Sequence, residues 1–83
     1  PEELKCPFWH QYGHLTKGNT MELHEHPTDE IYIVYSGQLM VTVGDEQEAV
    51  EAKDVITIPP NVKHTMTALS EEAVWAAFWW EHI

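Results

Sequence analysis

The sequence predicts an all-β fold with antiparallel strands, arranged as a sandwich or a barrel. Short runs rich in β-branched and aromatic residues recur along the chain, and Gly, Pro or Asn stands between them. The 83 residues show no repeat, low-complexity tract or linker composition, which indicates one domain. A chain of this length buries only about 60% of the surface of its unfolded form, so bound metal or self-association would add stability that its core lacks.

Eight strands are expected in chain order. The first ends at "TKGN", the second at Pro27, the third at "SG" and the fourth at "GD", and a double proline ends the sixth. A helix is the rival for the last segment, "SEEAVWAAFWWEHI", but this segment lacks a capping box, and β-forming residues dominate it after Ala73. The expected strands are 8–15, 20–26, 30–35, 39–43, 48–50, 54–58, 64–69 and 73–80.

The composition is strongly acidic, with fourteen Asp and Glu against four lysines and no arginine, and a formal net charge of −10. This charge argues against nucleic acid and anionic membranes as partners, because their phosphates would be repelled. Without arginine the chain lacks a bidentate clamp for carboxylate or phosphate. The single cysteine, Cys6, excludes an intrachain disulfide. With no signal peptide and no long apolar run we expect a cytoplasmic protein, although a chain that starts at Pro1 can be part of a longer one.

Two histidines ahead of an apolar run suggest a metal site. Residues two apart on a strand share a face, so His24 and His26 are expected to project together. Glu30 can return a carboxylate from the adjoining strand after the bend at Pro27, and His64 enters a later strand that could lie opposite. Three imidazoles and one carboxylate suit divalent Fe, Mn, Ni, Cu or Zn and leave open coordination positions. The residue types alone also allow a plainer interpretation, in which these histidines are surface or structural side chains.

A longer pattern surrounds these residues and consists of Gly18, His24, His26, Glu30 and Gly37. They occupy every fixed position of G-x5-H-x-H-x3,4-E-x6-G, the first motif of the cupin superfamily. The chain therefore resembles the cupins, and this first match is complete.

The second cupin motif, G-x5-P-x-G-x2-H-x3-N, is similar to "KDVITIPPNVKHTMTA", residues 53–68. Pro59 and His64 match, whereas Lys53, Asn61 and Ala68 replace two glycines and an asparagine. Asn61 is the mildest replacement, because asparagine tolerates the left-handed conformation that glycine supplies in a tight turn. The short spacer between the motifs is like that of small, single-domain, RmlC-like cupins.

The resemblance implies a double-stranded β-helix, a jelly-roll barrel that holds one divalent transition-metal ion. It implies that the ligands are His24, His26, Glu30 and His64. The single domain would comprise an N-terminal strand or arm (1–17), the first motif (18–37), the second motif (53–68) and a C-terminal aromatic strand (73–83).

The fold alone does not name a reaction, because cupins include dioxygenases, isomerases, epimerases, decarboxylases, lyases and sugar-binding sensors. Several of these enzymes are associated with a pocket arginine, which this chain lacks, so a small neutral, aromatic or enol-like substrate fits better. The leading hypothesis is a metal-dependent enzyme of the oxygenase type. The alternative is a non-enzymatic, metal-dependent module that binds or senses a small molecule.

Two residues are the first candidates for acid or base catalysis, Tyr32 and Glu22. Tyr32 shares the face of Glu30, and Glu22 shares the parity of His24. The competing interpretations are a packed core tyrosine and a surface glutamate. Besides Tyr32, the residues expected to line the pocket are Val34, Met40, Met66 and Phe78.

The last expected strand is apolar on both faces, since Trp75 and Trp79 alternate with Val74, Phe78 and Trp80. A barrel has one interior, so the second apolar face needs a cover. The N-terminal segment with Phe8 and Trp9 could provide it, but we expect a homodimer, because aromatic residues are common at interfaces. The sequence assigns no role to Cys6, His10, His14 or His82. The parity of His10 and His14 with Tyr12 allows an inward position, but we expect surface or structural roles.

Overall fold

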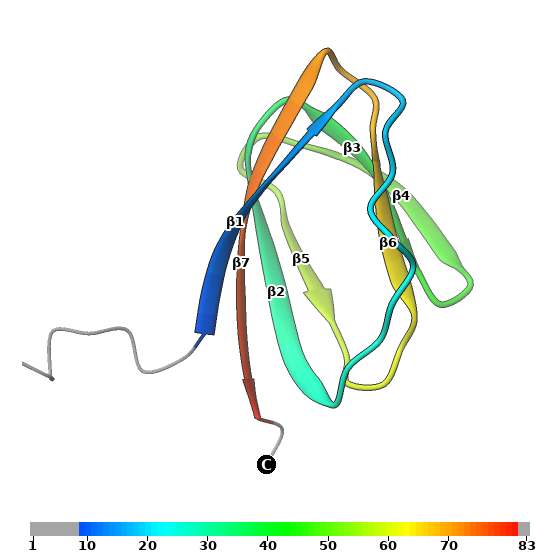
Figure 1. The fold of residues 1–83 in the computed structure, drawn as a ribbon, viewed down its shortest axis with the longest axis vertical. Helices are drawn as coiled ribbons and strands as arrows, with labels where there is room; N and C mark the ends of the chain where they lie inside the picture. The colour runs from blue at the N-terminus through cyan, green and yellow to red at the C-terminus, as the bar shows by residue number, and fades with distance from the viewer. Residues whose placement is uncertain (1–8, 82–83) are drawn as a thin grey trace, which may run out of the picture.

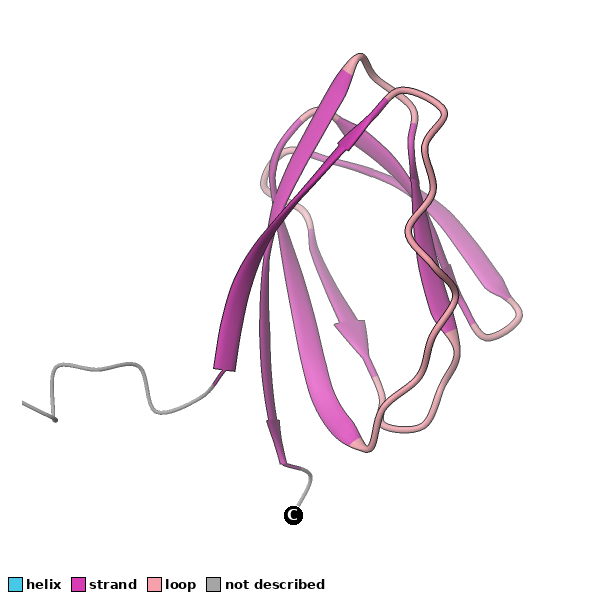
Figure 2. Ribbon diagram, viewed as in Figure 1, coloured by secondary structure: helices cyan, strands magenta, loops and turns pink. Residues whose placement is uncertain are grey.

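The computed structural model describes residues 9–81, and within this range every regular element is a strand (Figure 2). The all-β prediction is therefore confirmed, while Cys6, Phe8 and His82 lie outside the described residues. None of the described residues belongs to a helix that is long and apolar enough to cross a membrane. The strands are β1 (Trp9–Thr16), β2 (Thr28–Ser36), β3 (Gln38–Val43), β4 (Glu46–Glu51), β5 (Val55–Ile58), β6 (His64–Ala68) and β7 (Glu72–Glu81).

Two antiparallel sheets form the jelly roll (Figure 1). One sheet has four strands in the order β1-β7-β2-β5, and the other has three in the order β4-β3-β6. Strands far apart in sequence are neighbours, because β7 lies between β1 and β2, and β6 pairs with β3. The C-terminal aromatic segment is thus a central strand, as its β-forming residues predict.

The core lies between the sheets and follows the strand alternation. Tyr32 and Val34 of β2 face Leu39 and Val41 of β3 across the interior, and all four are buried. Among the described residues only two buried side chains are polar or charged, and each lies near the N-terminal end of its strand: Glu30 in β2 and His64 in β6. Buried polar groups are costly unless they are paired, so these two mark the place where the interior serves a purpose other than packing.

Residues 20–26 do not form the regular strand that the sequence predicts. The segment runs beside β6 and makes only isolated bridges, Thr20 with Thr67 and His24 with His64 (Figure 1). Between these bridges the segment advances four residues while β6 advances three, so one extra residue breaks the ladder as a β-bulge does. The segment nevertheless stays fastened to β6, since the backbone N–H groups of Met21 and His24 donate to β6 carbonyls.

Two residues that replace motif glycines keep a glycine-like backbone. Lys53 has a φ of 81° and Asn61 a φ of 62°, both in the left-handed region. Each also donates its backbone N–H, Lys53 to the Val34 carbonyl and Asn61 to the His26 carbonyl. The turns are therefore retained without the glycines, at a conformational cost that is larger for lysine than for asparagine.

Replacing Lys53 by glycine is expected to stabilise the protein, because glycine adopts this φ without strain and keeps the hydrogen bond to Val34. The free energy of unfolding should rise by about 1 kcal/mol relative to Lys53→Ala, the variant that removes the side chain but keeps the strain. Urea unfolding of both variants measures this difference. Equal stability of the two would show that the turn carries no strain.

Candidate metal centre

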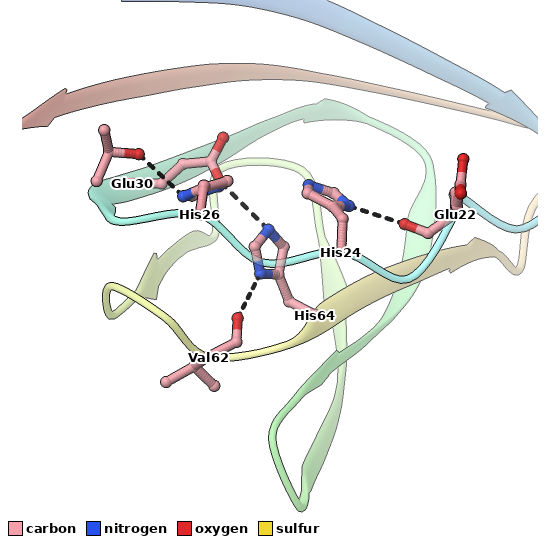
Figure 3. Close-up of polar contacts among 7 residues, drawn as sticks. Glu22, His24, His26, Glu30, Val62 and His64 are labelled. Atoms are coloured by element: carbon pink, nitrogen blue, oxygen red, sulfur yellow. Dashed lines mark hydrogen bonds and ion pairs between the residues drawn. The ribbon is translucent and has the colours of Figure 1, made fainter.

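Three histidines from two chain segments meet at one end of the barrel (Figure 3). His24 and His26 come from the segment beside β6, and His64 is the first residue of β6 itself. One ring nitrogen of each lies within 4.8 Å of the others, which places the histidine triad to hold a metal ion. The backbone bridge between His24 and His64 brings these two side chains together despite the 39 residues between them.

Backbone carbonyls fix the orientation of two of these rings. Nδ1 of His24 lies 2.8 Å from the Glu22 carbonyl oxygen, and Nδ1 of His64 lies 2.8 Å from the Val62 carbonyl oxygen (Figure 3). A carbonyl can only accept, so each Nδ1 carries the proton and each Nε2 is left with its lone pair. This second hydrogen bond is the usual arrangement of metal-binding histidines, because it sets the tautomer and the ring plane.

His26 is held between two side chains rather than by a carbonyl. Its Nδ1 lies 2.9 Å from Oγ1 of Thr28, and its Nε2 lies 2.8 Å from Oε1 of Glu30. In the metal-free protein Nε2–H can donate to Glu30, with the Thr28 hydroxyl donating to Nδ1. The hydroxyl can equally accept a proton from Nδ1, so His26 can also present a bare Nε2 to a cation.

The buried pair Glu30 and His64 supplies the test of whether a metal fits. Nε2 of His64 lies 3.4 Å from Oε1 of Glu30 and is buried without a hydrogen-bond partner among residues 9–81. A lone pair that faces a carboxylate in the interior is unfavourable unless a cation lies between or beside them. A proton or a metal ion would satisfy both groups, and the donor set is one that divalent transition metals accept.

The electrostatics of this pair favour its charged forms. Burial alone would raise the pKa of Glu30, but the close approach of the His64 ring, the hydrogen bond with His26 and the charges of both histidines outweigh it and lower this pKa below its ordinary value of 4.5. Burial alone would lower the pKa of His64, but Glu30 and the Val62 carbonyl outweigh it and raise this pKa above 6.5. The site therefore stabilises a carboxylate and attracts one compensating positive charge.

Metal affinity is expected to fall in acid, because a metal ion must displace the proton that the raised pKa of His64 favours. At pH values below this raised pKa the apparent association constant should fall about tenfold per pH unit for one displaced proton. Above that pKa it should level off. Competition with a chelator, repeated at several pH values between about 5.5 and 8, measures how the association constant depends on pH. An association constant that does not change with pH would contradict the assignment of His64 as a ligand.

A cavity of about 480 Å³ opens directly beside the histidines. His24, His26 and Glu30 line one side of it, and Trp75 and Trp79 of β7 line another. The opening allows a small molecule to reach an ion held by the histidines.

Four residues expected to line this pocket lie elsewhere, and the prediction is corrected for them. Val34 and Met66 are packed in the core farther along the barrel, because strand parity gives the face of a residue but not its depth. Met40 lies on the opposite face of β3 from Leu39, and the remaining residue, Phe78, lies on the opposite face of β7 from the cavity.

The two acid or base candidates are placed very differently. Tyr32 lines the cavity and is almost fully buried, and burial together with the neighbouring Glu30 raises the pKa of its hydroxyl. Tyr32 therefore keeps its proton and can act as a hydrogen-bond donor. Glu22 is exposed and does not line the cavity, and its backbone carbonyl contacts His24.

Sequence reasoning missed one residue that contacts the histidine triad. Thr28 contacts His26, and the signal for it is a hydroxyl two residues after the histidine. His10 and His14 do not face inward, since both are exposed and His14 lies 3.5 Å from Glu72 on the outer surface. The first strand thus contributes Gln11, Tyr12 and Gly13 to the cavity, not its histidines.

The comparison with known proteins agrees with this geometry. The sequence profile of the cupin domain matches residues 11–80. The chain belongs to the cupin family. The fold and the histidine triad described above are thus those of a cupin with a site placed to hold a metal ion.

Several relatives of this cupin are known. The uncharacterised protein SCO3923 of Streptomyces coelicolor is 36% identical over 58 residues, which cover 70% of this chain and 55% of that protein. A Cupin 2 conserved barrel domain protein from Salinispora arenicola is 25% identical with a TM-score of 0.83, over 92% of this chain and 65% of that one. The structure described as DMSP lyases RdDddP and RnDddQII has a TM-score of 0.82 at 24% identity, over 90% of this chain and 39% of that one, and shows the fold alone. The chain thus spans about half the length of its curated relative.

Proposed function

We propose that this cupin is a metal-dependent enzyme of the oxygenase type that acts on a small neutral aromatic or enol-like substrate. The observation that supports it most is the cavity of about 480 Å³, which reaches two of the three triad histidines, His24 and His26. Glu30 is proposed as the fourth ligand, because its Oε1 lies within 3.4 Å of Nε2 of both His26 and His64. When bound, a divalent iron, manganese, nickel, copper or zinc ion would supply Lewis-acid or redox chemistry there.

The charges of the site favour a particular substrate class. Three neutral imidazoles and one carboxylate leave a divalent ion with one net positive charge, which the single oxygen of a phenolate or enolate can neutralise. No lysine lines the cavity among the described residues, and the chain contains no arginine, so a separate carboxylate or phosphate group would find no cationic partner. An organic acid or phosphate ester therefore fits less well than a phenol or enol.

The chain's own residues have limited but definite roles in this proposal. The hydroxyl of Tyr32 keeps its proton and can donate a hydrogen bond to an oxygen of the bound substrate. Trp75 and Trp79 exclude water from the apolar part of the cavity. Glu30, buried and ionised, holds the positive charge of the site in place.

The alternative function is a non-enzymatic module that binds or senses a small molecule through its metal. One observation favours it: apart from His24, His26 and Glu30, the titratable side chains that line the cavity are tyrosines. A free general base is thus absent from the cavity lining among residues 9–81. Any base that removes a proton must then be part of the substrate itself or one of the metal ligands.

Turnover separates the two functions. The protein is loaded in turn with Fe(II), Mn(II), Ni(II), Cu(II) and Zn(II), and oxygen uptake and product formation are followed over a panel of phenols and enols. We expect turnover with at least one redox-active metal, and its loss in His64→Ala. Tight ligand binding without turnover under every metal would reject the enzyme and favour the binding module.

We also propose that a second copy of this chain covers the outer face of the four-stranded sheet. Tyr12, Ala76, Ile33 and Val55 form one apolar row across all four strands, and Tyr12 and Val55 are 69% and 58% exposed. The ring of Tyr12 stacks at 6.0 Å on that of Tyr35, which is 62% exposed. A chain of net charge −10 can approach its own copy most easily through such an uncharged row.

Light scattering over a range of protein concentrations tests this homodimer. We expect a dimer for the natural chain and a shift towards monomer for Val55→Lys, which places a charge in the row. A monomer at every concentration would reject the homodimer.

The cytoplasmic location stays a prediction.

A further inference from the structure

The strands β1 and β7 meet at one unusually close contact beside the cavity. Gly13 lies directly opposite Trp75 in the ladder, and both residues line the cavity. A Cβ atom at Gly13 would come within 2.1 Å of Cε2 and Cζ2 of the Trp75 indole and within 2.6 Å of its Nε1. The φ of Gly13 is not in the left-handed region, so the indole and not the backbone requires glycine at this position.

The surroundings of Trp75 restrict where its ring can go. On the β2 side it faces Val34, its ladder partner, and Tyr32, whose ring centroid lies 6.5 Å away in an edge-on arrangement. Both of these residues are almost fully buried in the packed core, which leaves no room for a displaced indole. The open direction is the cavity, so any side chain at position 13 would move the indole into the space that the cavity now offers.

We propose that Gly13 and Trp75 together determine the specificity of this cavity: the glycine lets the indole lie against β1, and the indole then forms an aromatic wall against which a flat, uncharged ring of the ligand stacks. This inference rests on the proposed function, since the same ligand would reach the metal at His24 and His26. An apolar cavity of about 150 Å³ already holds a benzene ring, so the cavity of about 480 Å³ has room for a ring with substituents. Trp79, four residues farther along β7 and on the same face, extends the wall.

The variant Gly13→Ala tests this wall with two probes of different size. In Co(II)-loaded protein, 4-nitrocatechol is a flat ring that binds a metal through its oxygens, and azide is a small anion that reaches the metal alone. We expect Gly13→Ala to weaken 4-nitrocatechol binding at least about tenfold, through loss of stacking and space. Azide affinity and cobalt content should stay within about twofold of the natural protein.

A second variant shows whether the effect passes through the indole. The smaller ring in Gly13→Ala/Trp75→Phe relieves the contact with the new methyl group, so the double variant should bind 4-nitrocatechol more tightly than Gly13→Ala. If Gly13→Ala does not fold, the double variant should still fold, and thermal unfolding of both variants checks this. Unchanged 4-nitrocatechol binding in Gly13→Ala, or no recovery in the double variant, would overturn the proposal.

The outcome is separable from that of the proposed function. Quenching of tryptophan fluorescence by 4-nitrocatechol in metal-free protein reports stacking without any metal. There too, Gly13→Ala should bind 4-nitrocatechol more weakly than the natural protein, and Gly13→Ala/Trp75→Phe more tightly than Gly13→Ala. Failure to bind metal or to turn over would reject the enzyme but leave this ranking as a test of the wall. Azide binding without 4-nitrocatechol binding by the natural protein would reject the aromatic ligand while leaving the metal site intact.

Discussion

Replacing His64 by alanine is expected to abolish tight metal binding. His64 is the most buried member of the triad, with 1% of its surface exposed, and its Nε2 lacks a hydrogen-bond partner among the described residues. Loss of an outer-shell partner alone typically weakens metal affinity about 10- to 100-fold, so loss of a ligand should weaken it by more than about 100-fold. Equilibrium dialysis with Zn(II) or Co(II), followed by elemental analysis, measures the change.

Thermal unfolding gives a second readout for the same variant. An ion at about 100 times its dissociation constant stabilises the natural protein by about 2.7 kcal/mol, and this gain should vanish in His64→Ala. The matched control is His14→Ala, which removes an exposed histidine on the outer surface of β1 and should leave both the affinity and the gain unchanged. Metal binding by His64→Ala at natural affinity would show that the triad is not the metal site.

The sequence predicted the histidine site well because its signals are local. His24 and His26 are two residues apart, and Glu30 is four residues beyond His26, so short-range geometry already places them close together. His64 was at first only a candidate from a later strand that could lie opposite, and the motif resemblance then linked it to the other ligands. The bridge between His24 and His64 supplies the physical reason for that link.

The cavity wall was less predictable, because it depends on ladder register between distant strands. Alternation correctly places Trp75 and Trp79 on one face of β7, but it does not say which residue of β1 lies opposite either of them. Alternation also placed Val34 and Met66 in the pocket, because it gives the face of a residue but not its depth, and both lie in the packed core. The bulge in residues 20–26 is similar, since one extra residue between two bridges leaves no mark on hydrophobic alternation.

Replacing Gly37 by alanine is expected to destabilise the protein strongly, although it adds only a single methyl group. Gly37 has a φ of 82° in the turn between β2 and β3. A Cβ there would lie 2.0 Å from the backbone oxygen of Glu72 and 2.8 Å from Cα of Ala73, at the start of β7. Both atoms belong to backbone, so they cannot move aside as the end of a flexible side chain can.

The surrounding hydrogen bonds make the turn rigid as well as crowded. The hydroxyl of Ser70 accepts the backbone N–H of Gln38 at 2.9 Å and donates to the Glu72 carbonyl at 2.6 Å. A methyl group at position 37 would press on this same hydroxyl, at 2.6 Å. Relief of the crowding must therefore break contacts that join β3 to β7.

The glycine at position 18 provides the matched control for this prediction. Gly18 has the same φ of 82°, but a Cβ there would meet nothing within 4 Å. Gly18→Ala should thus cost only the conformational strain, about 1 kcal/mol, whereas Gly37→Ala should add overpacking and cost about 3 kcal/mol or more. Urea unfolding of the two variants separates backbone strain from steric crowding, and equal losses would show that the turn at Gly37 can open without disturbing β7.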